Sequence, residues 1–330
     1  MKTKKYIISR NVLLNIVYFG IGLMLTYISA TSLLPIADDE IYYLTVAELP
    51  SSKEVLAASQ ADSLNFLWPL ILSILGPDNY DNYYRYLGSI IYISTLWLYV
   101  GKNNFVRLLT FIFSLPVFWY FGTYLRDGFI FACSLYLLSL TRGLMLNENR
   151  LSIINLILLI MLLAILSGLR FYYAIPFFII ILTIGAFKSG SVKWFYILIS
   201  IAIVFVLEET IVYAINTASK IDIKVIDFMR IILNPIPTDT FGQEIERYES
   251  SALYNITFII RVINLAIVLP VLLISLIKRK ISKEFIPELV FLICITITTV
   301  ATGNVGPRQS FIIGLIILTV FLKAKNWKIS

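Results

Sequence analysis

Long apolar runs separated by short polar segments dominate this chain from its first twenty residues onwards. Most runs approach the roughly 20 residues that an α-helix needs to cross a hydrocarbon core of about 30 Å. The pattern therefore predicts an all-α, polytopic integral membrane protein with about ten transmembrane helices. The predicted spans are residues 11–35, 82–101, 104–124, 128–142, 151–169, 171–187, 194–217, 254–277, 287–302 and 309–322.

The apolar stretch "LNFLWPLILSILG", residues 64–76, is not counted as a span. It contains a central proline and would reach only about 20 Å as a helix, so we interpret it as re-entrant or interfacial. With it left out, the predicted inner segments hold 17 of the 27 Lys and Arg residues. The excess of basic residues in cytoplasmic segments then predicts that both termini face the cytoplasm.

The chain is predicted to be a single transmembrane domain, 1–330, with two long outer loops. The first loop, 36–82, is expected to carry juxtamembrane or re-entrant helices, and the second covers 218–253. Fifteen of the twenty acidic residues lie in predicted outer segments. We therefore expect polar chemistry on the outer face.

Composition narrows the chemistry further. The chain is 59% hydrophobic and 14% charged, with a mean hydropathy of +0.86. It contains no histidine, which removes the commonest general base and zinc ligand. Cys133 and Cys294 lie in apolar runs and are interpreted as packing residues. The net charge of +7 comes from single basic residues at predicted helix ends, so no nucleic-acid partner is predicted.

An acidic cluster follows the first span in "SATSLLPIADDEIYYLTVAELP". Asp38, Asp39 and Glu40 stand beside Tyr42 and Tyr43. Carboxylates at a membrane surface can act as a general base or bind a divalent cation. Mg²⁺ or Mn²⁺ is the one candidate cofactor. The alternative is that the acids begin a short amphipathic helix, where negative charge is favoured. The two interpretations are compatible.

Single arginines stand at all three short outer turns, against the trend that favours basic residues inside. They are Arg126 in "YLRDG", Arg170 in "SGLRFYY" and Arg308 in "GNVGPR". Each has a simple structural explanation, an ion pair with Asp127 for the first and interfacial anchoring for the others. Together they predict a phosphate-binding clamp, because a guanidinium binds phosphate with two parallel hydrogen bonds.

Arg261 lies about two turns inside the predicted span 254–277. A charge at this depth predicts a functional site, here substrate binding. The alternative is a structural ion pair with Glu208 or Glu209, which also lie within a predicted helix.

These motifs resemble two families of membrane glycosyl-transfer enzymes. "ADDEIYYLTVAEL" after the first span is similar to the acidic first-loop motif of GT-C glycosyltransferases, and "GTYLRDGFIF" corresponds to their second acidic position. The stretch "NFLWPLILSILGPDNYDNYYRYLGSIIYISTLWLYVGKNNFVR" resembles their juxtamembrane helices. This similarity covers roughly residues 10–185, but the chain has no large C-terminal outer domain. The arginines in "YLRDGFIFACSLYLL", "ILSGLRFYY" and "NVGPRQSFIIGLIIL" are equally similar to polysaccharide polymerases of the Wzy and EpsG type.

The resemblance implies a bacterial inner-membrane enzyme of surface-polysaccharide assembly whose active site faces outwards. Its donor would be an undecaprenyl-phosphate- or diphosphate-linked sugar or repeat unit, and its acceptor a glycan or glycolipid. A chain-length regulator or other assembly protein would be a partner beside the bilayer. The expected catalytic residues are Asp38, Asp39 and Asp127, with Asp38 and Asp39 also as metal ligands. The expected substrate-binding residues are Glu40, Tyr43, Arg126, Arg170, Arg261 and Arg308.

Two other functions use the same features. A transporter or flippase of lipid-linked sugars would use the arginines without making bonds. The chain lacks the paired, similarly interrupted helices in two halves that many transporters show. A scaffolding protein would leave the acidic cluster without a purpose.

The predicted topology can be tested by introducing single cysteines. Cysteines at Asp62 and Arg247 should react with a membrane-impermeant maleimide added outside the cell, whereas cysteines at Lys102 and Lys280 should not. Labelling of position 102 from outside would mean that 64–76 crosses the membrane, and it would contradict the proposed site.

Overall fold

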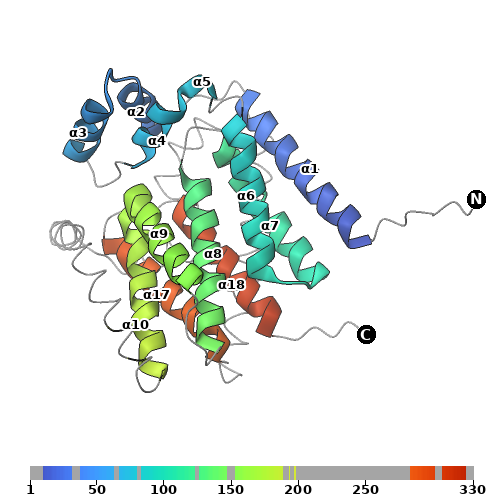
Figure 1. The fold of residues 1–330 in the computed structure, drawn as a ribbon. Coiled ribbons are helices and arrows are strands. Elements are labelled where there is room, and N and C mark those ends of the chain that lie inside the picture. The colour runs from blue at the N-terminus through green and yellow to red at the C-terminus, as the bar shows by residue number, and fades with distance from the viewer. Residues whose placement is uncertain are drawn as a thin grey trace, which may run out of the picture.

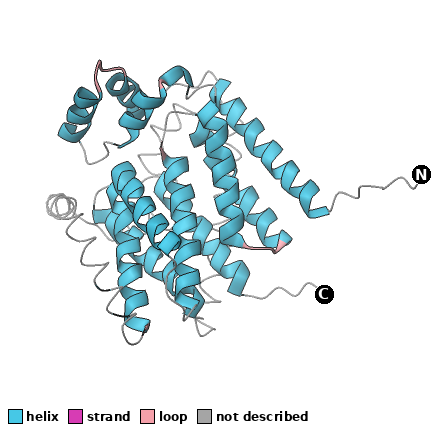
Figure 2. Ribbon diagram, viewed as in Figure 1, coloured by secondary structure: helices cyan, strands magenta, loops and turns pink. Residues whose placement is uncertain are grey.

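The protein is described from a computed structural model, and its described part is helical with no strand (Figure 2). The structure describes residues 10–31, 38–62, 67–79, 83–122, 126–146, 153–188, 193, 197, 283–301 and 307–324. The predicted spans 194–217 and 254–277, the second outer loop 218–253 and Arg261 lie outside these residues, apart from the single position 197.

The helices of the described part follow the apolar runs closely. They are α1 (Arg10–Thr31), α2 (Asp38–Ala47), α3 (Ser52–Asp62), α4 (Leu67–Leu75), α5 (Pro77–Asn79), α6 (Arg85–Val100), α7 (Asn104–Gly122), α8 (Asp127–Leu146), α9 (Ile153–Arg170), α10 (Ala174–Phe187), α17 (Ile286–Ala301) and α18 (Pro307–Ala324), with 3₁₀ turns η2 (Phe171–Tyr173) and η4 (Lys283–Phe285).

Within the part of the chain that the structure describes, three stretches are long and apolar enough to cross a membrane: Val12–Thr31, Asp127–Leu146 and Ile154–Phe187. The third is interrupted, because α9 ends at Arg170, whose backbone is extended (φ −164°, ψ 95°). The all-α fold class is thus confirmed for the described residues. The count of ten spans and the orientation of the termini remain predictions.

The helix ends are encoded locally by proline, glycine and asparagine. Pro69, Pro176, Pro287 and Pro307 all lie within the first three residues of their helices, where the missing N–H of proline has no intrahelical partner to lose. Between α6 and α7, Gly101 adopts a positive φ of 88°, as is common just after a helix. The side chain of Asn103 then accepts hydrogen bonds from the backbone of the first turn of α7 at 3.0 and 3.2 Å.

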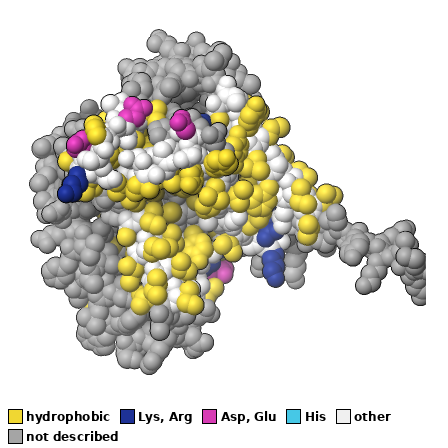
Figure 3. All heavy atoms as spheres, turned by 45° about the horizontal axis from the view of Figure 1, so that its top comes forward, with side chains coloured by type: hydrophobic (Ala, Val, Ile, Leu, Met, Phe, Trp, Pro, Cys, Tyr) yellow, Lys and Arg dark blue, Asp and Glu magenta, His cyan; other side chains and the backbone are white. Residues whose placement is uncertain are grey.

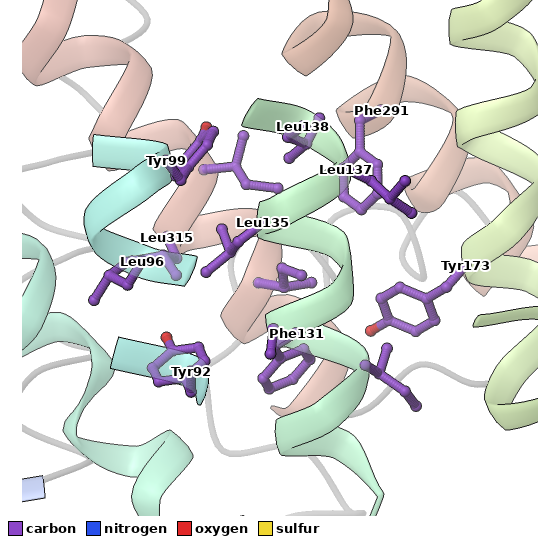
Figure 4. Close-up of a cluster of buried hydrophobic side chains, with 14 of the residues drawn as sticks. Tyr92, Leu96, Tyr99, Phe131, Leu135, Leu137, Leu138, Tyr173, Phe291 and Leu315 are labelled. Carbon is purple, nitrogen blue, oxygen red and sulfur yellow. The ribbon is translucent and has the colours of Figure 1, made fainter. Parts of the chain in front are cut away.

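Helix α8 is central in the described bundle. It contacts α6, α7, α9, α10 and α17, while α1 packs against α6 and α7, and α18 against α7 and α17. Figure 4 shows the apolar core around it, in which Tyr92, Leu96, Phe131, Leu135 and Leu138 are completely buried. Large apolar side chains are also exposed on the outside of the bundle, among them Ile16, Tyr27, Ile154 and Ile157. An apolar exterior of this kind fits a bilayer better than water.

Helices α2, α3, α4 and α5, which we call the cap, lie together over one end of the bundle (Figure 1). Helix α4 contacts α2, α3 and α9. It has nine residues, so it is about 14 Å long and too short to cross a bilayer, as expected for 64–76. Figure 3 shows acidic side chains on the cap and mainly apolar side chains on the bundle beside it. The cap therefore adds charged side chains to this end of the apolar bundle.

Candidate functional site

Three charged side chains are buried together where the cap meets the bundle. Arg126 precedes α8, Asp127 is its first residue, and Arg170 is the last residue of α9. Their exposed fractions are only 4%, 1% and 6%. A nitrogen of the Arg170 guanidinium donates a hydrogen bond to Asp127 Oδ1 at 3.1 Å. The ion pair joins the start of one helix to the end of the next through residues that are 43 positions apart in sequence.

Both members of this ion pair stand where the helix dipole favours their charge. Asp127 lies at the positive N-terminal end of α8 and Arg170 at the negative C-terminal end of α9. The Arg126 carbonyl also accepts the backbone N–H groups of Phe129 and Ile130, each at 3.1 Å. The start of α8 therefore fixes Arg126 and Asp127 next to each other.

Aromatic rings complete the surroundings of the two guanidinium groups. Arg126 lies 5.1 Å from the centre of the Tyr43 ring, and Arg170 lies 5.5 Å from that of Tyr172. Cation–π contacts of this length are attractive, more so when the groups are desolvated. Since Tyr43 belongs to α2, the contact with Arg126 connects the cap directly to the charged cluster.

The cluster carries more positive than negative charge. Burial, and then the nearby charge of Arg170, lower the pKa of Arg126 from its ordinary value, while Tyr43 and Asp127 act in the opposite direction. An arginine nevertheless stays protonated in proteins. Among the described side chains of this cluster, two guanidinium groups accompany one carboxylate. Because a guanidinium group is a preferred partner of phosphate, this is a candidate anion-binding site. We call Tyr43, Arg126, Asp127 and Arg170 the outer cluster.

These four residues had all been predicted as site residues, and the structure brings them together. The other predicted residues are placed only in part. Helix α2 begins at Asp38, so Asp38, Asp39 and Glu40 form its first turn, as the helix-start interpretation expects. Their side chains lie outside the described part of the structure, and their catalytic and metal-binding roles remain predictions. Among the described side chains, no three carboxylates or thiols gather as a metal site.

Arg308 lies in the first turn of α18, which begins at Pro307, and its side chain is not described. The ring of Phe311, one turn further along, is 5.8 Å from that of Phe131. Phe131 in turn lies one turn from Asp127 on α8. The beginning of α18 therefore reaches the same end of the bundle as the outer cluster.

Three residues near the cluster were not predicted as site residues. Arg85 is buried at the start of α6, and its guanidinium donates to the Gly122 carbonyl at the end of α7. Tyr172 contacts Arg170, and Tyr173 is completely buried beside it. The two tyrosines stand two and three residues after Arg170 in "LRFYY", which was interpreted only as part of an interfacial aromatic belt.

A second charged cluster lies at the opposite end of α8. Arg142 forms an ion pair with Glu288 at the start of α17. Arg142 also donates to the Tyr99 carbonyl at 3.1 Å, and Lys323 at the end of α18 donates to the same oxygen. Fifteen residues separate Asp127 from Arg142, or about 22 Å along the helix. We call Tyr99, Arg142, Glu288 and Lys323 the inner cluster.

Comparisons of this chain with models of protein families, with characterised proteins and with solved structures give no match. The function must therefore be argued from the site itself.

The ion pair at the outer cluster can be tested with a double-mutant cycle. Asp127→Asn should lower the free energy of unfolding by about 3–5 kcal/mol, because it leaves buried guanidinium groups without their carboxylate. Arg170→Gln should cost less, since Arg126 still stands beside the carboxylate. The double variant should lose clearly less than the sum of the two.

The measurement is unfolding of the purified protein in detergent micelles. Glu48→Gln, which changes an exposed carboxylate on the cap, is the control and should change stability little. Strictly additive losses for Asp127→Asn and Arg170→Gln would contradict the pairing.

Proposed function

We propose that this protein is a glycosyl-transfer enzyme of bacterial surface-polysaccharide assembly, acting at the outer face of the inner membrane. Its donor is a sugar or repeat unit linked to undecaprenyl phosphate or diphosphate, and its acceptor is a glycan or glycolipid. The related single-sugar transferase and the repeat-unit polymerase use the same chemistry. They differ in how many sugars move in one step.

The observation that carries this proposal is the outer cluster. It combines two buried guanidinium groups, one carboxylate and aromatic rings at the end of an apolar helical bundle that the cap covers. A lipid-linked phosphate has the matching parts, an anionic head group and a hydrocarbon tail that stays in the bilayer. Guanidinium groups in a site of low dielectric bind such a head group strongly.

The acids at the start of α2 are within reach of this cluster. Tyr43 contacts Arg126, and Asp39 precedes Tyr43 by four residues in the same helix, a spacing at which residues share a helix face. One turn of helix measures about 5.4 Å. This supports a base on α2 close to the phosphate that Arg126 and Arg170 would hold.

The reaction can be written with these residues and the two substrates. Asp38 or Asp39 takes the proton of an acceptor hydroxyl, whose oxygen attacks the anomeric carbon of the donor sugar. The bond from that carbon to the phosphate oxygen breaks, and its electron pair leaves with the phosphate. Arg126 and Arg170, with Arg308 at the start of α18, stabilise the negative charge on the leaving group. Asp127 holds Arg170 in place before the donor binds.

Transport of lipid-linked sugars without bond-making is the second candidate function. The observation that favours transport is the presence of a charged cluster at each end of α8. The middle of α8 between them is packed with buried apolar side chains, including Leu135, Leu137 and Leu138 (Figure 4). A carrier would have to move a charged head group through this region. The packing therefore favours chemistry at the outer cluster.

Replacing the first acids of α2 separates catalysis from helix capping. In Asp38→Asn and Asp39→Asn the side-chain oxygen that can cap a helix is kept, so stability should change by only a few tenths of a kcal/mol. Basicity is lost, and removing a general base typically slows a reaction about 10²- to 10⁴-fold. At least one of the two variants should insert normally and fail to extend the surface glycan.

The glycan ladder on a gel, beside a blot for the protein, measures both effects. Glu48→Gln removes a carboxylate from the same cap without touching the first turn of α2 and should give a normal ladder. Normal ladders from both aspartate variants would exclude the catalytic role and leave these acids as helix caps.

A further inference from the structure

The hydroxyl group of Tyr173 is a buried polar group without a hydrogen-bond partner among the described residues. Tyr173 ends the 3₁₀ turn η2, three residues after Arg170, and its exposed fraction is 0%. Within the described residues its hydroxyl oxygen has no hydrogen-bond partner. Buried polar groups are nearly always hydrogen-bonded, so a hydroxyl of this kind needs an explanation. The simplest explanation is a partner that binds from outside the chain.

The position of this hydroxyl identifies the partner. In Figure 4 the ring of Tyr173 points its oxygen towards α8 near Phe131, which lies one turn from Asp127. The ring of Tyr173 also lies 5.1 Å from that of Tyr172, which contacts the Arg170 guanidinium. The hydroxyl is therefore directed towards the first turns of α8, the helix that begins with Asp127 of the outer cluster.

We propose that the Tyr173 hydroxyl donates a hydrogen bond to a phosphate oxygen of the bound lipid-linked donor. This inference rests on the proposed function and adds a third donor to the site. Arg126 and Arg170 supply charge, which attracts phosphate from any direction. A phenol on a packed ring supplies a neutral donor at one fixed point, which limits how deeply the head group enters. Tyr173 would thus set the depth of the phosphate in the membrane.

Removal of one oxygen atom tests this role. The Tyr173→Phe variant of the full chain keeps the ring and its packing. Because the hydroxyl has no partner among the described residues, its removal should leave the thermal stability unchanged or raise it. Binding of farnesyl phosphate, a short prenyl phosphate, should weaken about tenfold, because hydrogen bonds to charged groups are among the stronger ones. Farnesol, which lacks the phosphate, should bind the variant and the original protein equally.

Tyr99→Phe is the matched control. Tyr99 is equally buried and belongs to the inner cluster, at the opposite end of the bundle. Its replacement should leave farnesyl phosphate binding unchanged. Calorimetric titration in detergent gives the affinities, and thermal unfolding of the unliganded proteins gives the stabilities.

The outcomes separate this inference from the proposed function. If the original protein binds farnesyl phosphate and Tyr173→Phe binds it equally well, the role of Tyr173 is wrong and the proposed function stands. A clear fall in the stability of unliganded Tyr173→Phe would show that the hydroxyl already has a partner, and it would also overturn the inference. If the original protein binds farnesyl phosphate no better than farnesol, the phosphate site itself is wrong and both proposals fail.

Discussion

The energetic cost of burying charge governs the arrangement of this molecule. An isolated charge inside a bundle of apolar helices is strongly unfavourable, and removing one partner of a buried pair is costly. The ion pair between Asp127 and Arg170 meets this cost with a direct hydrogen bond and with two helix dipoles. Arg126 adds a further positive charge and lies against Tyr43. The cap is thereby held over the same end of the bundle where the charge is concentrated.

Along helix α8, the described bundle has a charged cluster at each end and apolar side chains in the middle. The outer cluster surrounds its first residue, and Arg142 of the inner cluster lies about four turns away. The inner cluster ties together the ends of α6, α8, α17 and α18 through Tyr99, Arg142, Glu288 and Lys323. We interpret it as a structural anchor, since its charges are engaged with each other and with the Tyr99 carbonyl.

The apolar runs predicted the positions of the described helices well, because the apolar residues that favour burial of a segment are the same residues that form its helix. Asp127 and Arg170 were recognised for a related reason, as charges are conspicuous next to apolar runs. Their pairing with each other was not predicted, since it depends on how α8 and α9 pack. The same holds for Glu288 and Arg142, which are 146 residues apart. Tyr173 was overlooked because a tyrosine in "FYY" looks like any interfacial aromatic residue until its hydroxyl is found buried.

The central claim is that the outer cluster holds a lipid-linked phosphate, and site-directed mapping of a bound probe tests it most directly. The purified full chain is irradiated with a farnesyl phosphate that carries a photoreactive diazirine near its head group, and the labelled peptides are identified by mass spectrometry. The account predicts labelling around Arg126 at the start of α8 and around Arg170 at the end of α9, reduced by an excess of unmodified farnesyl phosphate. Labelling concentrated around Arg142 and Lys323 at the opposite end would contradict it.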